Sequence, residues 1–459
     1  MTDNWFDESD EWSDEPDDAA QDDTKIESDI ESKVSDTATG ERQIATLPDG
    51  RYLVLTGPGA GSALLDGTGS TEARTSIPTR DEALLTGALP MMLVHRPHQA
   101  AGVTPRLLAS IVAATQGGVS LGVSAMLPSA SESAITQWLS EHPAAALRLA
   151  DPGCYLMDPT IVRNKPLSER TLRWAPYLGR EVLDMRELLD HQRNVGANLL
   201  LSPGRALDPT NPQDSLDEAF AAADDAISEL NAGERLALNL TMSTQWLTST
   251  TLREALFAQL VDQEQFDLWH IRVQWPASLR AFQQPSDASL LGGYKRLAQL
   301  ASDEERQLLL PQTGLTGWLQ LGFGAAGFGA GPFGVGQAFK EHSQGGGGGN
   351  TPVPRYFEPT LLHYVERSVH DALSSQPDYE TCDCPYCPAL LADADWDHEL
   401  ARLHGLHWLG RLAALPTTSG RSIEAAIRRT VRTARRAAER QPLADISSPQ
   451  HLRAWDPLL

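Results

Sequence analysis

Three of the four cysteines in this chain fall within six residues, at Cys382, Cys384 and Cys387, while the fourth, Cys154, lies far upstream. A cysteine thiolate is a strong zinc ligand, and the spacing Cys-x-Cys-x-x-Cys lets one tight turn present three sulfur atoms to a single ion. The cluster therefore predicts a zinc site. Free buried thiols or a redox pair are the alternative.

A fourth zinc ligand has to come from another residue, and three histidines follow the cluster: His398, His404 and His407. The stretch 403–409 has the pattern of an amphipathic helix that can bring one imidazole back to the cysteines. We favour His404 as the fourth ligand. Three thiolates and one imidazole would complete the coordination shell, which is typical of a structural Zn²⁺ rather than a catalytic one.

From about residue 88 onward, short apolar runs alternate with longer stretches whose apolar residues recur at helical spacing. The candidate strands are 91–94, 119–123, 146–150, 198–201, 236–240, 269–273 and 307–310. The candidate helices are 104–116, 131–141, 182–195, 215–230, 250–262 and 290–305. This α/β alternation predicts parallel strands joined by helices, in an open doubly wound sheet or a closed barrel. Because no nucleotide-binding fingerprint accompanies the repeats, we expect a TIM-type (β/α)8 barrel.

In such a barrel, the chemistry lies at the carboxyl ends of the strands. Asp151 and Asp208 are the candidate catalytic carboxylates there. The candidates for substrate binding are Arg205, Arg272, Gln274 and Gln312, and Thr241 and His270 also lie in or after these strands. Each also has a structural explanation, since Asp151 opens an ordinary Asp-Pro-Gly turn sequence and polar groups in a barrel mouth can satisfy one another.

A glycine-rich stretch with interleaved phenylalanines occupies residues 321–336. Glycine permits close backbone approach and phenylalanine offers a stacking face, so we expect a loop that wraps a base or a phosphate, or else a segment of low complexity. Five glycines at 345–349 predict a flexible linker. A helix over 358–373 is then expected to lead to the cysteines.

These patterns divide the chain into five parts. They are a disordered acidic tail at 1–40, a barrel body with an N-terminal hairpin at 41–340, a Gly-rich linker at 341–355, a zinc-binding subdomain at 356–415, and an Arg-rich helix and tail at 416–459. No apolar run is long enough to span a membrane, and the N-terminus does not have the pattern of a signal peptide, so we expect a cytoplasmic protein.

The net charge of −24 argues against a nucleic-acid partner, but its distribution weakens that argument. More than half of the excess of acidic over basic residues lies in residues 1–40, where Lys25 and Lys33 are the only basic residues. The last part of the chain holds a basic cluster made up of Arg421, Arg428, Arg429, Arg432, Arg435, Arg436 and Arg440. This cluster predicts either a phosphate-binding patch or a solvated helix face.

Together, the Cys382-x-Cys384-x-x-Cys387 cluster, the later His404-Gly405-Leu406 and the glycine-rich end of a barrel resemble the tRNA-guanine transglycosylase superfamily. The resemblance implies a TIM barrel with a zinc subdomain bound by three cysteines and a histidine. It also implies the exchange of a guanine for a 7-deazaguanine base, in tRNA or, in some relatives, in DNA. The expected partner is nucleic acid, and we allow for a homodimer or a heterodimer.

The catalytic part of the family pattern is not visible in this chain. Family members use an aspartate nucleophile and a second aspartate as general base, but no Asp-Ser-Gly-Gly-Phe stretch is present and no aspartate lies between residue 321 and Asp371. Either the carboxylate has moved, to Asp151 or Asp208, or the chain is a non-catalytic paralogue or partner subunit that only binds nucleic acid. An unrelated barrel enzyme with a structural zinc knuckle is a third interpretation.

Overall fold

The computed structural model describes residues 42–46, 52–56, 77–85, 88–97, 104–159, 161, 166–279, 283–331, 337–341, 353–392, 396–441, 443 and 447–459. In the first two ranges, β1 (Arg42–Thr46) and β2 (Tyr52–Thr56) pair antiparallel, at the position of the predicted hairpin. The predicted acidic tail at 1–40 and the predicted five-glycine linker at 345–349 lie outside the described residues.

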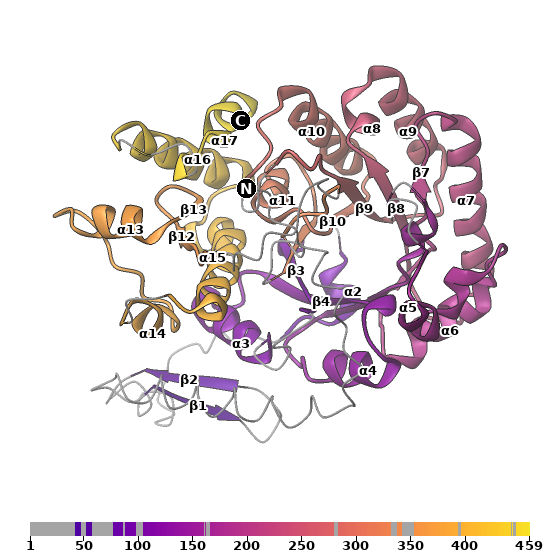
Figure 1. Cartoon of the computed structure of the whole chain (residues 1–459), viewed down its shortest axis with the longest axis horizontal. Coiled ribbons are helices and arrows are strands. Elements are labelled where there is room, and N and C mark those ends of the chain that lie inside the picture. Colours follow the sequence, from indigo (N-terminus) through magenta and orange to yellow (C-terminus); the bar gives the residue numbers. More distant parts are fainter. Residues whose placement is uncertain are drawn as a thin grey trace.

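Eight parallel strands form a nearly closed, barrel-like sheet at the centre of the molecule (Figure 1). They are β3 (Met91–His95), β4 (Ser120–Met126), β5 (Leu147–Asp151), β6 (Leu200–Leu201), β8 (Leu236–Ser243), β9 (Leu268–Gln274), β10 (Gln307–Leu310) and β11 (Gly327–Ala330). Their spatial order is β5-β4-β3-β11-β10-β9-β8-β6, and the short β7 (Ala206–Leu207) pairs with β8 outside it. The predicted parallel α/β fold is confirmed, and the arrangement fits a TIM-type barrel.

Asn198 bridges the two ends of this sheet, β5 and β6. Its side-chain oxygen accepts a hydrogen bond from Arg148 N–H at 2.7 Å, and its amide donates to the carbonyl oxygen of Ala146 at 2.9 Å. Side-chain hydrogen bonds thus replace part of the backbone ladder where the barrel closes.

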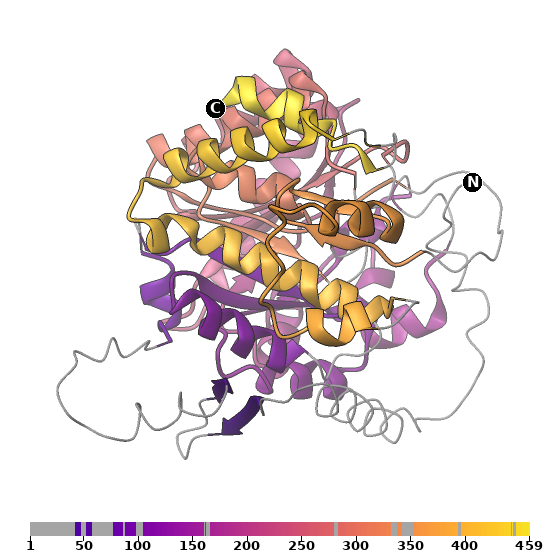
Figure 2. The same cartoon turned by 90° about the vertical axis from the view of Figure 1, so that its left-hand side faces the viewer.

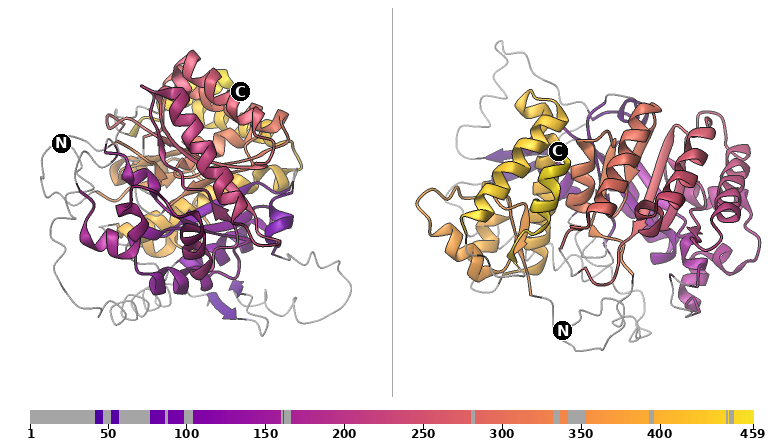
Figure 3. Two further views of the ribbon diagram at one scale, coloured as in Figure 1. Left: turned by 90° about the vertical axis from the view of Figure 1, so that its right-hand side faces the viewer. Right: turned by 90° about the horizontal axis from the view of Figure 1, so that it is seen from above.

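Helices follow the strands and cover the outside of the barrel, with those from the middle of the chain lying opposite the C-terminal segments (Figure 3). The larger ones are α3 (Thr104–Thr115), α4 (Glu132–Ser140), α6 (Met185–Asn194), α7 (Pro212–Ser228), α9 (Thr250–Asp262), α10 (Ala288–Asp303) and α11 (Gly314–Leu321). Shorter ones are α2 (Arg80–Ala83), η3 (Leu127–Ser129), η4 (Cys154–Met157), α5 (Glu169–Trp174), η5 (Pro176–Gly179) and α8 (Gln245–Thr248). The side chains of Ser131, Asp184, Ser249 and Asp287 cap four of these helices, whose predicted starts lie within three residues of the observed ones. Within the described residues, no helix combines the length and the apolar character that a membrane crossing requires.

The eighth barrel strand, β11, lies inside the glycine-rich stretch that we expected to form a loop. The loop prediction is wrong at 327–330, where Gly327 pairs with Met91 of β3 and with Leu309 of β10. Glycine is required there because the inside of the barrel is crowded. An added Cβ would lie 2.8 Å from Met91 Cβ at Gly327 and 2.4 Å from His95 Nε2 at Gly329.

The predicted helix over 358–373 is wrong in its first half. The structure instead has an antiparallel pair, β12 (Tyr356–Glu358) and β13 (His363–Val365), followed by α13 (Arg367–Ser374). Pro359 follows β12 directly, and aromatic and β-branched residues dominate both strands, which favours extended backbone. The C-terminal elements are α14 (Cys387–Ala392), α15 (His398–Ser419), the predicted Arg-rich helix α16 (Ile423–Glu439), α17 (His451–Trp455) and η7 (Asp456–Leu458).

Helix α15 belongs to both the metal-ligand cluster and the barrel. It packs against α3 and α11, so it fills the remaining position in the ring of helices around the sheet. The fit is close: a Cβ at Gly410 would lie 2.5 Å from Ile111 of α3, and Thr417 donates a hydrogen bond to the carbonyl oxygen of Gly118 at 3.1 Å. The cysteine cluster is therefore joined to the barrel by a long helix rather than by a linker alone.

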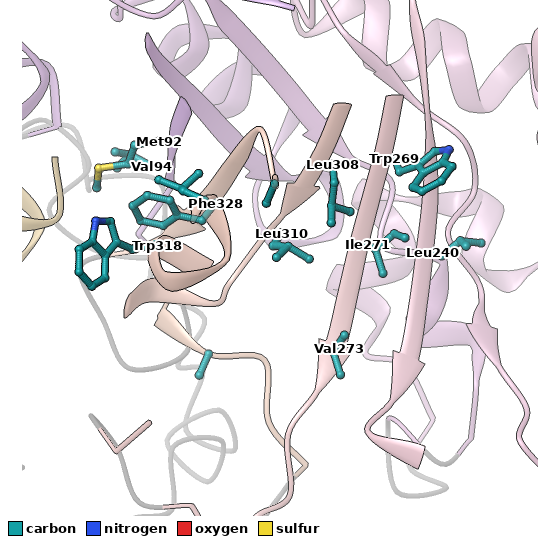
Figure 4. Close-up of a cluster of buried hydrophobic side chains, with 14 of the residues drawn as sticks. Met92, Val94, Leu240, Trp269, Ile271, Val273, Leu308, Leu310, Trp318 and Phe328 are labelled. Carbon is teal, nitrogen blue, oxygen red and sulfur yellow. The ribbon is translucent and has the colours of Figure 1, made fainter. Parts of the chain in front are cut away.

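The core has an outer and an inner part, because successive residues of a strand point to opposite faces. In the outer part, side chains such as Ile271, Leu310 and Phe328 pack toward the helices, together with Trp318 of α11 (Figure 4). The inner part fills the barrel near the amino ends of the strands. It is formed by Ala83, Leu84, Met91, Leu93, Ala146, Leu147, Leu149, Leu199, Leu201, Ala237, Leu268 and Leu309.

Candidate functional site

The structure brings the four predicted metal ligands together. The Sγ atoms of Cys382, Cys384 and Cys387 and Nδ1 of His404 all lie within 4.8 Å of one another. His404 Nδ1 is 3.3 Å from both Cys384 Sγ and Cys387 Sγ, and 3.9 Å from Cys382 Sγ. His404, Cys384 and Cys387 are buried, and Cys382 is half-buried. Four soft or borderline donors converge here, with the identity and spacing of a tetrahedral site.

Local structure places each of these ligands. The backbone N–H of Cys384 points at Cys382 Sγ at 3.4 Å, which tightens the turn, and Cys387 is the first residue of α14. Asp397 caps α15 by accepting from the N–H groups of Glu399 and Leu400. Two turns into that capped helix, His404 faces the cysteines.

The neighbours of His404 fix its tautomer for metal binding. Its Nε2 lies 2.8 Å from the carbonyl oxygen of Phe357 in β12, so Nε2–H donates and the lone pair of Nδ1 faces the sulfur atoms. The ring of Tyr356 stacks on the imidazole at 4.2 Å, and its hydroxyl lies 3.4 Å from Cys387 Sγ. Trp408 Nε1–H donates to Cys382 Sγ at 3.1 Å. A histidine oriented by a backbone carbonyl is a regular feature of protein metal sites.

The charge of the cluster also suits a cation. Burial lowers the pKa of the His404 imidazole, but its hydrogen bonds with Cys382 and Cys384, together with their charge, outweigh burial and raise that pKa to about 9. The same negative charge would favour a metal ion in place of the proton on Nδ1, so the donor set fits Zn²⁺. With three sulfurs and one nitrogen, it would leave no open position for a substrate.

A second candidate site lies inside the barrel. The inward-facing residues near the amino ends of the strands are apolar, whereas those near the carboxyl ends are polar and buried. We call this second set the polar layer. It consists of half-buried His95 and of buried Ser124, Asp151, Asn239, Thr241, His270, Arg272 and Gln274. Buried polar groups are costly unless they bond to one another or to a ligand, so this layer marks the part of the barrel where binding chemistry is concentrated.

Asp151 and Arg272 form a buried ion pair at the centre of the polar layer. The Arg272 guanidinium donates to the Asp151 carboxylate, to Gln312 Oε1 at 2.8 Å and to Thr241 Oγ1 at 3.1 Å. The other Asp151 oxygen accepts from Gly153 N–H at 2.9 Å. Three of the sequence candidates, from β5, β9 and the end of β10, therefore meet in one network.

Two histidines complete the polar layer. His95 Nε2 accepts a hydrogen bond from the backbone N–H of Gln312 at 3.1 Å, and burial, followed by the charge of Arg272, lowers the His95 pKa to about 3. His270 Nδ1 lies 2.9 Å from Asn239 Oδ1, and burial holds its pKa well below the usual value. The Nε2 atom of His270 is buried and has no hydrogen-bond partner in the described part of the chain. Both rings are therefore neutral at neutral pH.

Aromatic rings close the polar layer from above. The Arg272 guanidinium carbon lies 4.6 Å from the ring centre of Tyr155 and 5.7 Å from that of Phe339, and these rings meet edge to face at 5.2 Å. Together with Ile161 they form a small buried cluster. Burial raises the pKa of the Tyr155 hydroxyl, which therefore stays protonated.

The other sequence candidates are placed differently. Gln274 is buried at the end of β9, two residues beyond Arg272. Half-buried Arg205 lies close enough to Cys154 to oppose the burial that raises the pKa of that thiol. Asp208 is exposed and accepts hydrogen bonds from the Thr210 hydroxyl and N–H, which lower its pKa. The structure therefore does not bring Asp208 into the polar layer.

Sequence reasoning missed five residues of this site: Tyr155, Phe339, His95, Ser124 and Asn239. A signal existed for Asn239, which interrupts an apolar strand at an inward position of the two-residue period, and for His95, which ends one at such a position. For Tyr155 and Phe339 the sequence carries no such signal, since Tyr155 lies in η4 and Phe339 follows almost two hundred residues later in a loop.

Comparison with known proteins identifies no relative of this chain: no family model matches it, and neither does any curated protein.

Proposed function

We propose that Cys382, Cys384, Cys387 and His404 bind one structural Zn²⁺. The observation that supports this proposal is the convergence of the four donor atoms within 4.8 Å, with His404 Nε2 held by the Phe357 carbonyl. When bound, the ion would tie α14 and α15 to the turn at 382–384. Its binding free energy would then contribute directly to the stability of this subdomain.

Metal analysis of two matched variants tests the zinc proposal. Cys384→Ser removes a donor from the cluster, and we expect stoichiometric zinc to fall to well below one ion per chain. Cys154→Ser is the control, because Cys154 is a buried cysteine outside the cluster and its variant should keep the metal. Full zinc content in Cys384→Ser would refute the site.

We further propose that the chain is a zinc-containing barrel protein of the tRNA-guanine transglycosylase type that acts on a guanine or 7-deazaguanine base in tRNA or DNA. The supporting observation is the polar layer around Asp151 and Arg272, which lies beneath two aromatic rings in a barrel joined to the cysteine cluster. A site that takes up a base needs stacking faces and hydrogen-bonding groups. Tyr155 and Phe339 would supply the faces, and Gln312, Thr241 and Asn239 the polar groups.

In the proposed exchange, the Asp151 carboxylate attacks C1′ of the sugar, and the C1′–N9 bond breaks as its electron pair leaves with guanine, which takes up a proton. The incoming base then displaces the carboxylate from C1′ and gives up its ring proton, so that atoms and charge balance. Arg272 and the Gly153 N–H would hold the carboxylate in place. Tyr155 and Phe339 would have to move apart to admit the base.

One observation favours the second candidate function, a non-catalytic nucleic-acid-binding subunit with the same fold. Among the described residues, only Asp151 and Glu358 are buried acidic residues, and Glu358 belongs to β12 near the cysteine cluster. The two-carboxylate arrangement of the family is therefore not assembled in the polar layer, and Asp151 is already engaged by Arg272.

Incubation of the full chain with labelled guanine and 7-deazaguanine bases, in the presence of tRNA or duplex DNA, separates the two functions. Incorporation that is lost in Asp151→Ala but kept in Asp208→Ala supports base exchange at the polar layer. Nucleic-acid binding without incorporation of any base supports the non-catalytic subunit. Full incorporation by Asp151→Ala would remove Asp151 from the mechanism.

A further inference from the structure

Six of the seven arginines in and beside α16 fall into two groups, and Arg421, which precedes the helix, belongs to neither. Three of them are neutralised by acidic partners: Arg428 pairs with Glu424, Arg432 Nε bonds to Asp456 Oδ1 at 3.0 Å, and Arg435 bonds to Asp456 Oδ2 at 2.6 Å. The two pairs with Asp456 connect α16 to the C-terminal residues, whereas the pair with Glu424 lies within the helix; all three leave their arginines little free charge.

The second group has no acidic partner. Arg429, Arg436 and Arg440 are exposed, and none of their side chains makes a hydrogen bond or an ion pair within the described part of the chain. They lie seven and four residues apart, so they project from one side of the helix at intervals of about 10 Å and about 6 Å. We call these three residues the arginine stripe.

The arginine stripe is held on a fixed support. On the opposite side of α16, Ala426, Ile427, Val431 and Ala434 are buried, and the Ser422 side chain caps the first turn. Ile427 lies against Gly322 at the end of α11, so this end of the helix rests on the barrel. At the other end, the side chains of Gln441 and Gln376 exchange hydrogen bonds at 2.9 and 3.0 Å, which attaches it to the segment after α13.

The stripe therefore runs along the flank of the barrel toward the metal-ligand subdomain. Figure 2 looks onto the face of the molecule that is covered by α15 and α16. From the geometry we propose that the arginine stripe binds the phosphate backbone of a nucleic acid, outside the barrel and apart from the polar layer. This inference rests on the proposed function in one respect, namely that both take nucleic acid as the partner.

Three physical arguments support a phosphate backbone as the occupant. The guanidinium group is planar, permanently charged and able to bond two phosphate oxygens at once. The three groups repeat along a line, as the charges of a strand do. The exposed neighbours of the stripe on α16 include Ala425 and Thr433 but no aromatic or large aliphatic residue. A protein partner normally requires such an apolar anchor, whereas a phosphate backbone does not.

Fluorescence anisotropy with labelled tRNA and labelled duplex DNA, measured over a series of salt concentrations, tests the proposal. For the variant Arg429→Gln/Arg436→Gln/Arg440→Gln, we expect binding at low salt to weaken by roughly ten- to a hundredfold. Because each phosphate contact contributes about 0.9 to the salt dependence on duplex DNA, the slope of log affinity against log salt should fall by about 2 to 3.

A matched variant controls for net charge. Arg180→Gln/Arg186→Gln/Arg235→Gln also removes three positive charges, but these arginines pair with Glu187, Glu229 and Asp267 at other places on the barrel. We expect its affinity to change less than about twofold, since its arginines make no phosphate contact. Both variants should melt like the parent chain, because the substituted side chains are exposed or form surface ion pairs.

The outcomes separate this inference from the proposed function. If the parent chain binds neither tRNA nor DNA, the arginine-stripe inference and the proposed function are both wrong. If the parent chain binds and the stripe variant binds equally well, or if the two variants weaken equally, the arginine stripe is not the binding surface and the proposed function still stands. A selective loss in the stripe variant supports the stripe.

Discussion

Asp151 and Arg272 illustrate what the sequence can and cannot reveal about individual residues. Both were predictable as candidates, because each lies at the carboxyl end of an apolar strand. Their pairing was not predictable, because they are 121 residues apart and meet only when the barrel closes. The cysteine cluster is the opposite case, since three of its four ligands are local in the sequence. A site whose residues are close in the sequence can be predicted from their spacing, whereas a site whose residues are far apart can be recognised only once the fold is known.

The buried ion pair leads to a prediction about stability. Asp151→Asn leaves the Arg272 charge buried without its partner, so we expect the free energy of unfolding to fall by about 3–5 kcal/mol. The double variant Asp151→Asn/Arg272→Met removes both charges and should lose less than Asp151→Asn alone. Urea denaturation measures both, and Asp208→Asn is the control, because an exposed carboxylate should change stability by only about 0.5 kcal/mol. A double variant that is less stable than the single one would contradict this account.

His142 leads to a prediction about pH. Burial lowers its pKa from 6.5 to about 4 in the folded chain, so the unfolded chain binds the proton more tightly between these values. The free energy of unfolding is therefore unaffected by protonation of this group above pH 6.5. It decreases as the pH falls from 6.5 toward 4, by up to about 3 kcal/mol. His142→Asn should therefore show a smaller loss of unfolding free energy between pH 7 and pH 5 than the parent chain. Equal losses in the two proteins would exclude His142 as a source of this acid sensitivity.

At the scale of elements, strands and helices with ordinary apolar patterns and caps were predictable, and β11 was not. Its sequence, Gly-Phe-Gly-Ala, has low intrinsic strand propensity. It forms a strand because β3 and β10 pair with it on both sides, and because the inside of the barrel has no room for a side chain there. The half-wrong helix at 358–373 has a similar cause, since pairing between β12 and β13 prevailed over a pattern that also suited a helix.

The crowding at β11 predicts the effect of adding one methyl group. In Gly329→Ala the new Cβ would press on His95 Nε2 and on the backbone near Gln312, so we expect a loss of about 1–3 kcal/mol in the free energy of unfolding. Gly292→Ala is the matched control. Gly292 lies in α10 with no atom within 4 Å of the added Cβ, so alanine should stabilise the helix by about 0.5–1 kcal/mol. Thermal denaturation distinguishes the two, and a neutral Gly329→Ala would show that the barrel interior is less tightly packed than described.

At the scale of the whole molecule, α15 links two features that the sequence shows separately. The alternation of strands and helices and the cysteine cluster can both be recognised in the sequence. Only the structure shows that the helix that supplies His404 also packs on α3, as part of the ring of helices around the barrel. The charged residues are distributed unevenly along the chain. The chain carries a net charge of −24, yet the arginine stripe has no acidic partner in the described residues, and most of the acidic excess lies in residues 1–40.

This uneven charge predicts how residues 1–40 affect association with nucleic acid. A strongly acidic segment repels phosphates and competes for arginines, so a chain that begins after residue 40 should bind tRNA and DNA more tightly and faster at low salt. The difference should shrink as salt rises, because the screening length falls to about 10 Å at 0.1 M and about 3 Å at 1 M. A full-length chain with the acids of residues 1–40 replaced by Asn and Gln separates charge from length, and it should behave like the shortened chain. If the neutralised chain instead binds like the parent, the effect of residues 1–40 does not come from their charge.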